Sequence, residues 1–227
     1  MILVDLLPIV MLGAFLGMDV VTFPQAMISR PIVAATVAGA FLGNALAGLV
    51  MGAILELLAL EMLPFGASRY PEWGSASVVG GALYASSWGD PPGALAASLL
   101  GALVTAMVSG WSMVRLRRLN AARATRLRPQ LDAGSARAVT SLQLFGLTGD
   151  LVRGGLVTLG GMLAFGWLTG EIAQRWGTDG RDTRAAVVAV VAAVAAGAVW
   201  KIFHSVPKAR LLFVGGLVIG AVLVVSR

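Results

Sequence analysis

Cysteine is absent from the 227 residues, and histidine occurs once, at His204. Without cysteine the chain forms no disulfide, no thiolate nucleophile and no cysteine metal site. One histidine is too few for a histidine metal site or a histidine dyad. The sequence also lacks the GxxxxGK[ST], GxSxG and HExxH motifs, which argues against direct use of ATP and against two types of membrane hydrolase. We therefore expect no catalytic residue, no metal and no cofactor in this chain.

Charge is scarce: 12% of residues are charged, 58% are hydrophobic, and the mean hydropathy is +0.86. A helix of about 17 to 25 apolar residues spans a bilayer. Five stretches carry no charge, namely 31–55, 94–114, 154–170, 185–200 and 211–226. Because helices satisfy their own backbone hydrogen bonds in lipid, the sequence predicts an all-α, polytopic membrane protein with about six to eight membrane segments.

The net charge of +6 is concentrated in one segment, residues 115–137. Because this segment lies between apolar stretches, its charge does not indicate nucleic-acid binding. The positive-inside rule predicts that it is cytoplasmic, and so does the alternative interpretation, that its arginines bind anionic headgroups. The balanced segment 171–184 is then outside and the basic segment 201–210 inside. The seven arginines, opposed by Asp132 alone, are Arg115, Arg117, Arg118, Arg123, Arg126, Arg128 and Arg137.

This segment divides the chain into an N-terminal membrane half (1–114), a cytoplasmic arginine-rich connection (115–137) and a C-terminal membrane half (138–227). The first half holds nearly all the polar groups at membrane depth. In the second half, Asp150 and Arg153 are three residues apart and are predicted to form an ion pair along a helix.

The apolar run 31–63 is too long for one span and too short for two. It is interrupted by Gly43 and Asn44, and this pattern predicts a span followed by a broken or re-entrant helix. Irregular backbone at membrane depth is tolerated only in a protein interior or beside a water-filled cavity. The sequence therefore predicts a cavity in the N-terminal half, into which Glu56 would point. Glycines four residues apart, such as Gly48 and Gly52, are typical of close helix packing, and we prefer this interpretation to a direct role in transport.

Ionisable groups at membrane depth are costly, so Arg30 and Glu56 are candidates for function. The segment 63–74 is predicted to be a structured loop, because two prolines and two glycines break a helix there. It carries charges, a hydroxyl and aromatic rings, the mixture that recognises sugars. The alternatives are that Arg30 is an interfacial anchor, that Glu56 forms a structural ion pair, that Tyr70 and Trp73 belong to an aromatic belt, and that Asp19 is a helix cap.

Several motifs, in order, resemble a known family. They are Gln25-Ala-Met-Ile-Ser-Arg-Pro31, Leu42-Gly-Asn44, Gly52-Ala-Ile-Leu-Glu-Leu57, Pro64-Phe-Gly-Ala67 and Pro71-Glu72. They are similar to the first half of the IIC subunit of the mannose/fructose/sorbose branch of the bacterial phosphotransferase system. The resemblance implies a sugar-translocating, multi-pass subunit of the bacterial cytoplasmic (inner) membrane. It also implies an elevator-like shift of one domain and a polar sugar site, for which we expect Gln25, Arg30, Asn44, Glu56, Arg69 and Glu72.

The resemblance further implies an oligomeric complex with a IID-like membrane subunit, while soluble IIA and IIB-like proteins relay phosphate on histidines. The covalent chemistry would then be performed by a partner, since this chain offers no phosphoryl-transfer residue. The chain departs from the family where Asn44 and Glu72 replace aspartates, and its C-terminal half is short. Two alternatives remain open: a non-transporting scaffold or sensory subunit of the same fold, and an ion-coupled secondary transporter.

Overall fold

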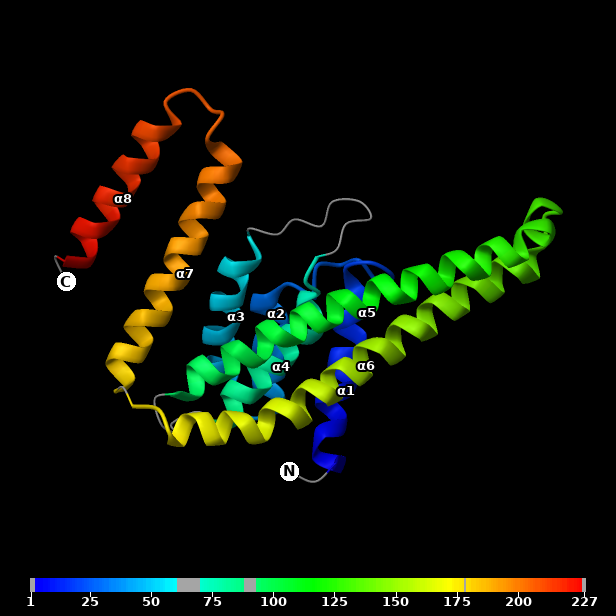
Figure 1. Cartoon of the computed structure of the whole chain (residues 1–227), viewed down its shortest axis with the longest axis horizontal. Coiled ribbons are helices and arrows are strands. Elements are labelled where there is room, and N and C mark those ends of the chain that lie inside the picture. Colours follow the sequence, from blue (N-terminus) through cyan, green and yellow to red (C-terminus); the bar gives the residue numbers. More distant parts are fainter. Residues whose placement is uncertain (1–2, 61–69, 88–92, 178, 226–227) are drawn as a thin grey trace.

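The computed structural model describes residues 3–60, 70–87, 93–177 and 179–225. Within these ranges every regular element is an α-helix, as predicted (Figure 1). The helices are α1 (Leu3–Asp19), α2 (Pro31–Phe41), α3 (Ala45–Ala59), α4 (Trp73–Ser86), α5 (Gly93–Asp132), α6 (Ala136–Gln174), α7 (Gly180–Phe203) and α8 (Ala209–Val225). Three of them, α5, α6 and α7, each contain a stretch long and apolar enough to cross a membrane. The apolar stretches of α1, α2, α3 and α8 are shorter.

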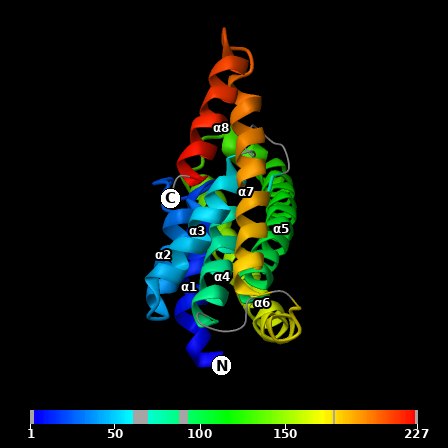
Figure 2. The same ribbon diagram turned by 90° about the vertical axis from the view of Figure 1, so that its left-hand side faces the viewer.

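The core is built around α4, which packs against α1, α2, α3, α5 and α6. Eleven of its fourteen residues are buried, and five of those are serine or glycine, small residues that allow neighbouring backbones to come close. Figure 2 shows α1 to α4 gathered into one bundle, with α7 beside α3. Because α4 has neighbours on all sides, any polar group at its ends meets several helices at once.

The apolar run 31–63 breaks at Gly43, whose φ of +78° is in the left-handed region that favours glycine. Asn44 then caps α3, its side-chain oxygen accepting a hydrogen bond from the N–H of Ala47 at 3.0 Å. The result is a hairpin of two short helices, α2 and α3, instead of a full span followed by a shorter one. Helices of 11 and 15 residues are about 16 and 22 Å long, less than the roughly 30 Å of hydrocarbon.

Glycine lets α2 and α3 touch at the backbone. A Cβ on Gly48 would collide with the carbonyl oxygen of Ala35 and lie 3.0 Å from the Cα of Gly39. We expect Gly48→Ala to lower the free energy of unfolding by about 1–3 kcal/mol, because the two backbones must move apart. Unfolding in mixed micelles measures this. Gly197→Ala is the control, since its Cβ would meet open space on α7; equal losses in both variants would contradict the expectation.

The predicted connection 115–137 is helical for most of its length. Alanine, leucine and arginine favour helix, so α5 continues to Asp132, and α6 begins at Ala136 after Gly134, whose φ is +73°. The two helices pack along each other and project from the bundle as a hairpin (Figure 1). We call residues 115–149 the arginine arm. At about 1.5 Å per residue, the 40 residues of α5 are about 60 Å long, twice the thickness of the hydrocarbon core.

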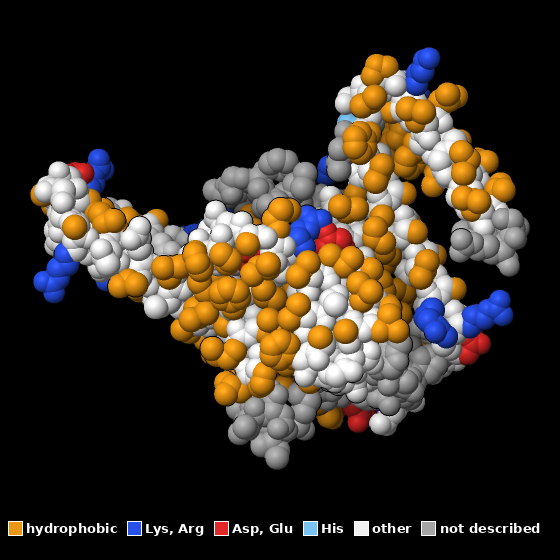
Figure 3. Space-filling view, turned by 180° about the vertical axis from the view of Figure 1, so that it is seen from behind, with side chains coloured by type: hydrophobic (Ala, Val, Ile, Leu, Met, Phe, Trp, Pro, Cys, Tyr) orange, Lys and Arg blue, Asp and Glu red, His pale blue; other side chains and the backbone are white. Residues whose placement is uncertain are grey.

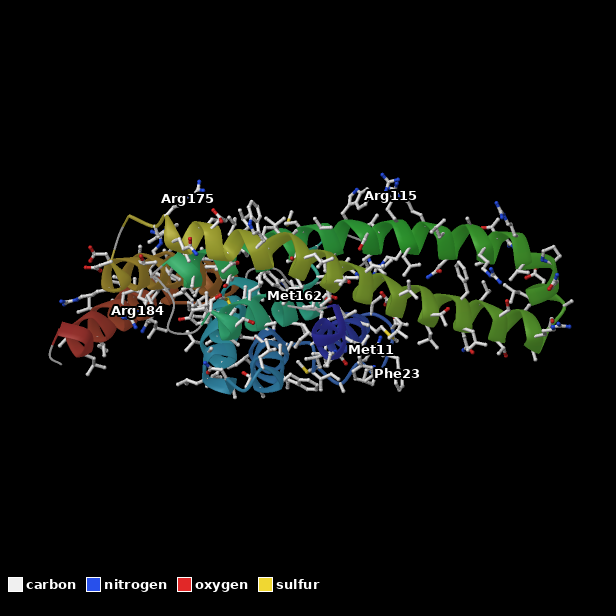
Figure 4. The ribbon with its side chains drawn as sticks, turned by 90° about the horizontal axis from the view of Figure 1, so that it is seen from below. Met11, Phe23, Arg115, Met162, Arg175 and Arg184 are labelled. Atoms are coloured by element: carbon white, nitrogen blue, oxygen red, sulfur yellow. The ribbon has the colours of Figure 1, made fainter. Side chains whose placement is uncertain are left out.

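Basic segments lie at the end of the bundle from which the arm projects. The C-terminal part of α7 and the following turn lie beside Leu57 and Leu60, at the end of α3. The opposite end holds the α6–α7 connection, where Trp176 packs against Gly93 at the start of α5. In Figure 4, Arg175 and Arg184 lie remote from the arm, whereas Arg115 points away from the α1–α4 bundle. Segments 115–137 and 201–210 therefore share one end, and 171–184 occupies the other, as the charge alternation predicts.

Candidate functional site

A cavity of about 260 Å³ lies at the end of the bundle from which the arm projects. The end of α1, the segment after it, the start of α2, the end of α3 and the start of α4 form its wall. Its lining combines polar groups with apolar surface and two aromatic residues. The lining residues are Asp19, Val20, Gln25, Met27, Ser29, Arg30, Pro31, Ala59, Leu60, Tyr70, Pro71, Glu72 and Trp73.

Asp19 folds the segment 20–30 over the cavity. Its carboxylate is buried and accepts hydrogen bonds from the N–H groups of Ala26 (2.7 Å) and Ser29 (2.9 Å), and from the Ser29 hydroxyl (2.8 Å). Gln25 and Met27 in this segment have φ values of 58° and 60°, which cost energy in residues other than glycine. Such strained residues cluster at functional sites. Gln25 is exposed and donates to the Val21 carbonyl at 3.2 Å, which leaves its amide oxygen to accept.

Arg30 and Glu56 form an ion pair across the start of α2 and the end of α3. Pro31 occupies the first turn of α2, and the Arg30 side chain has no acceptor with which to cap it. The Glu56 carboxylate performs this role and accepts from the N–H of Ile32 at 3.2 Å. Glu56 is 16% exposed and does not line the cavity, whereas Arg30 is 44% exposed and does. Glu56 is therefore linked to the cavity through its ion pair with Arg30.

Glu72 is 2% exposed, yet it lines the cavity at the N-cap of α4. One carboxylate oxygen accepts from the N–H of Ser75 at 3.1 Å, and the other accepts from the Ser109 hydroxyl at 2.6 Å. The guanidinium of Arg153 lies 3.8 Å from the second oxygen. A buried carboxylate is costly unless it is paired and hydrogen-bonded, and Glu72 satisfies both conditions.

Arg153 is the centre of this buried network. Its Nε donates to Asp150 at 2.7 Å, which confirms the predicted helical pair. Its two terminal nitrogens donate to the Ser109 hydroxyl at 2.7 Å and to the Gly17 carbonyl at 2.9 Å. Asp150 also accepts from the Thr22 hydroxyl. The network therefore joins α1, α5 and α6 to Glu72 and to the segment that carries Gln25.

The base of the arginine arm contacts the cavity wall. Arg117 donates to the Tyr70 hydroxyl at 2.6 Å, and its guanidinium carbon lies 5.3 Å from the centre of the Tyr70 ring. Tyr70 packs closely on Gly110 of α5, where a Cβ would meet the Tyr70 carbonyl. A residue of the arm thus fixes the orientation of a ring that lines the cavity.

Of the residues expected to bind sugar, the structure brings together Gln25, Arg30 and Glu72, with Glu56 joined to them through Arg30. Asn44 caps α3 at the far end of the α2–α3 hairpin. Arg69 is outside the described residues. Sequence reasoning did not connect Arg153, Asp150 and Ser109 with the site. The sequence offers one indication of their importance: Asp150 and Arg153 form an isolated charged pair in a C-terminal half that is otherwise poor in charge at membrane depth.

Residues 3–173 match the model of the family described as "PTS system sorbose-specific iic component". The chain belongs to this IIC family. The resemblance expected from the N-terminal motifs is therefore confirmed, and the IIC match extends well beyond the first 85 residues, into α6. This IIC chain is accordingly a multi-pass membrane subunit of a phosphotransferase-system sugar transporter.

Two solved structures share the fold of this IIC family member. One, described as "Structure of membrane protein", has a TM-score of 0.74 and 18% identity, over 99% of this chain and 95% of that one. The other, from "CryoEM Structure of Mannose Transporter ManYZ and Microcin E492 (MceA) complex", has a TM-score of 0.62 and 17% identity, over 97% and 87% of the two chains. At these identities the likeness shows the fold alone. No curated protein matches the chain.

Proposed function

We propose that this IIC family member translocates a hexose-type sugar and passes it to a partner that phosphorylates it. The observation that carries the proposal is the cavity of about 260 Å³, in which Gln25, Arg30 and Glu72 lie beside Tyr70 and Trp73. Drug-sized ligands occupy pockets of about 300–1,000 Å³, so a slightly smaller cavity suits a monosaccharide. The mannose transporter of similar fold supports the substrate class.

The polar groups of the cavity match the hydrogen bonds that a sugar loses on leaving water. Each unreplaced hydroxyl bond costs about 1–3 kcal/mol. In this proposal Glu72 accepts from hydroxyls, Arg30 donates to them, and Gln25 does both. The rings of Tyr70 and Trp73 cover the apolar faces of the sugar. Glu56 positions Arg30, and Asn44 takes no part because it caps α3 at the other end of the hairpin.

The distribution of basic residues supports an orientation. The cavity shares its end of the bundle with segments 115–137 and 201–210, which the positive-inside rule assigns to the cytoplasm. We infer that the chain lies in the cytoplasmic (inner) membrane of a bacterium, with the cavity in this structure nearer the cytoplasmic side. A soluble, IIB-like phosphocarrier would meet the sugar there.

The outer surface of α7 and α8 supports a membrane partner. In Figure 1, α8 folds back from α7 and stands apart from the bundle, and Figure 3 shows hydrophobic side chains along both helices. A largely apolar groove of about 540 Å³ runs between α3, α7 and α8, lined in part by Ala195, Ala196 and Gly216. Small residues at such a surface permit close helix contact. We infer that a IID-like membrane subunit packs here in an oligomeric complex.

Sugar uptake tests the proposal. The chain is expressed with its IIA, IIB and IID partners in a host that lacks its own system, and hexose uptake is measured with and without phosphoenolpyruvate. We expect Arg30→Gln to weaken apparent sugar affinity by about tenfold, because a charged donor to the sugar is lost. Arg175→Gln is the control, since Arg175 is exposed at the opposite end of the bundle.

The outcomes separate the alternatives. Uptake that depends on phosphoenolpyruvate and weakens with Arg30→Gln supports the proposal. Uptake indifferent to phosphoenolpyruvate indicates an ion-coupled secondary transporter. Normal assembly with the partners but no uptake of any hexose indicates a scaffold or sensory subunit.

A further inference from the structure

We propose that the distal part of the arginine arm is the docking site for an acidic face of a soluble protein. The partner's identity rests on the proposed function, in which a soluble phosphocarrier acts at the cavity. The arm carries seven arginines and one aspartate between residues 115 and 137, which accounts for the whole net charge of +6. The remainder of the chain is balanced, so the arm dominates the long-range electrostatic field.

The arginines of the arm are largely available to a partner. In the part of the chain that the structure describes, Arg118, Arg126 and Arg137 are exposed and have no acidic side chain within ion-pair distance. Arg128 meets Asp132 at 3.8 Å, with both side chains more than two-thirds exposed, and such a pair contributes little. Exposed Leu119 (59%), Val139 (46%) and Leu144 (57%) lie among them. Arginine is enriched at protein interfaces.

The length of the arm places its tip beyond the membrane surface. Residues 115–132 extend about 27 Å past Val114, where the uncharged stretch ends. We take α5 to be tilted by no more than about 40°, the upper end of the range for membrane helices, which puts the tip about 20 Å above the hydrocarbon core. That height exceeds the headgroup layer of about 5–7 Å plus the Debye length of about 8 Å. In this orientation anionic lipids would reach Arg115 and Arg118 but not the distal arginines Arg126, Arg128 and Arg137.

A second copy of this chain does not suit the distal arm, because two arms of the same strong charge repel each other. A soluble protein with an acidic face has the complementary charge, and electrostatic attraction would speed its association. Arg117, at the base of the arm, bonds to Tyr70 in the cavity wall. A protein bound along the arm is thereby placed beside the cavity, at the same end of the bundle.

The test uses the full chain in nanodiscs of phosphatidylcholine and the purified soluble phosphocarrier of the same transport system as probe. The dissociation constant is measured at low and at physiological salt for wild type and for Arg126→Gln/Arg128→Gln/Arg137→Gln. We expect the triple variant to bind at least about tenfold more weakly, with a smaller dependence on salt. The matched control is Lys201→Gln/Lys208→Gln/Arg210→Gln, which removes three positive charges at the same end and should bind within about twofold of wild type.

Equal affinity of the distal triple variant and wild type would overturn the proposal, as would an equal loss in both triple variants. The comparison is repeated in nanodiscs that also contain phosphatidylglycerol. Unchanged phosphocarrier binding combined with lower retention of phosphatidylglycerol by the distal triple variant would assign the distal arm to the membrane and overturn the proposal. Should the triple variant lose helicity, the single variants Arg126→Gln and Arg137→Gln carry the same comparison. Hexose binding to the wild-type chain alone is measured in parallel. If hexose binding is absent while the phosphocarrier still binds in a way that depends on the distal arginines, only the proposed sugar function is overturned.

Discussion

Replacing Arg153 with glutamine is expected to lower the free energy of unfolding by about 3–5 kcal/mol, the cost of removing one partner from a buried ion pair. Arg153 is 7% exposed and is the cation of a network that also contains Glu72 and Asp150, both nearly inaccessible to solvent. The variant leaves two carboxylates without their guanidinium and the Gly17 carbonyl without its donor. Equilibrium unfolding in mixed micelles, followed by tryptophan fluorescence, measures the loss.

Arg118→Gln is the control for this experiment, because Arg118 is exposed on the arm, and its substitution should change stability by less than about 0.5 kcal/mol. The double variant Arg153→Gln/Asp150→Asn should recover part of the loss, since one of the two unpaired charges is also removed. Similar stabilities for Arg153→Gln and Arg118→Gln would show that the network contributes little.

Replacing Glu72 with alanine is expected to weaken sugar binding by about tenfold to a hundredfold and to reduce uptake accordingly. A hydrogen bond to a charged group contributes about 1.5–3 kcal/mol, and about 1.4 kcal/mol corresponds to a factor of ten. Glu72 is a buried carboxylate that lines the cavity, and Ser75, Ser109 and Arg153 hold it in one orientation. Hexose binding to the purified chain measures the effect.

Asn44→Ala is the matched control for Glu72→Ala. Both residues cap a helix with a side-chain oxygen, and the loss of either cap should cost about 1 kcal/mol of stability. Glu72→Ala should cost more in total, because it also removes a partner of the buried Arg153. Only Glu72 lines the cavity, and Asn44 is at the far end of the α2–α3 hairpin. Sugar affinity should therefore stay near that of wild type in Asn44→Ala. Comparable losses of affinity in the two variants would mean that capping, and not contact with the sugar, explains the result.

The N-terminal motifs predicted the family and the approximate position of the cavity, because they are local. Gln25 and Arg30 lie in one short segment, and the prolines around Glu72 interrupt the helical pattern next to it. Gly43 and Asn44 predicted the break between α2 and α3 for the same reason, since glycine and an N-cap residue act on the backbone where they stand.

Contacts between distant segments were not predictable in this way. Thr22 and Asp150 are 128 residues apart, and Gly17 and Arg153 are 136 apart. Nothing in the local pattern around Arg153 distinguishes a surface ion pair from the centre of a buried network. Likewise, the arginines in 115–137 indicated a polar environment but not a pair of continuous helices.

Composition and local pattern thus determined that this chain is an all-helical membrane protein, which family it resembles, and where its charge is concentrated. These properties depend on hydropathy, on backbone propensities and on short motifs, all of which act over a few neighbouring residues. Only the tertiary structure decided that Asn44 lies away from the cavity, that Glu56 pairs with Arg30, and that Arg153 joins three helices to Glu72. Those assignments depend on which helix ends meet in space, and packing across the whole chain sets that arrangement.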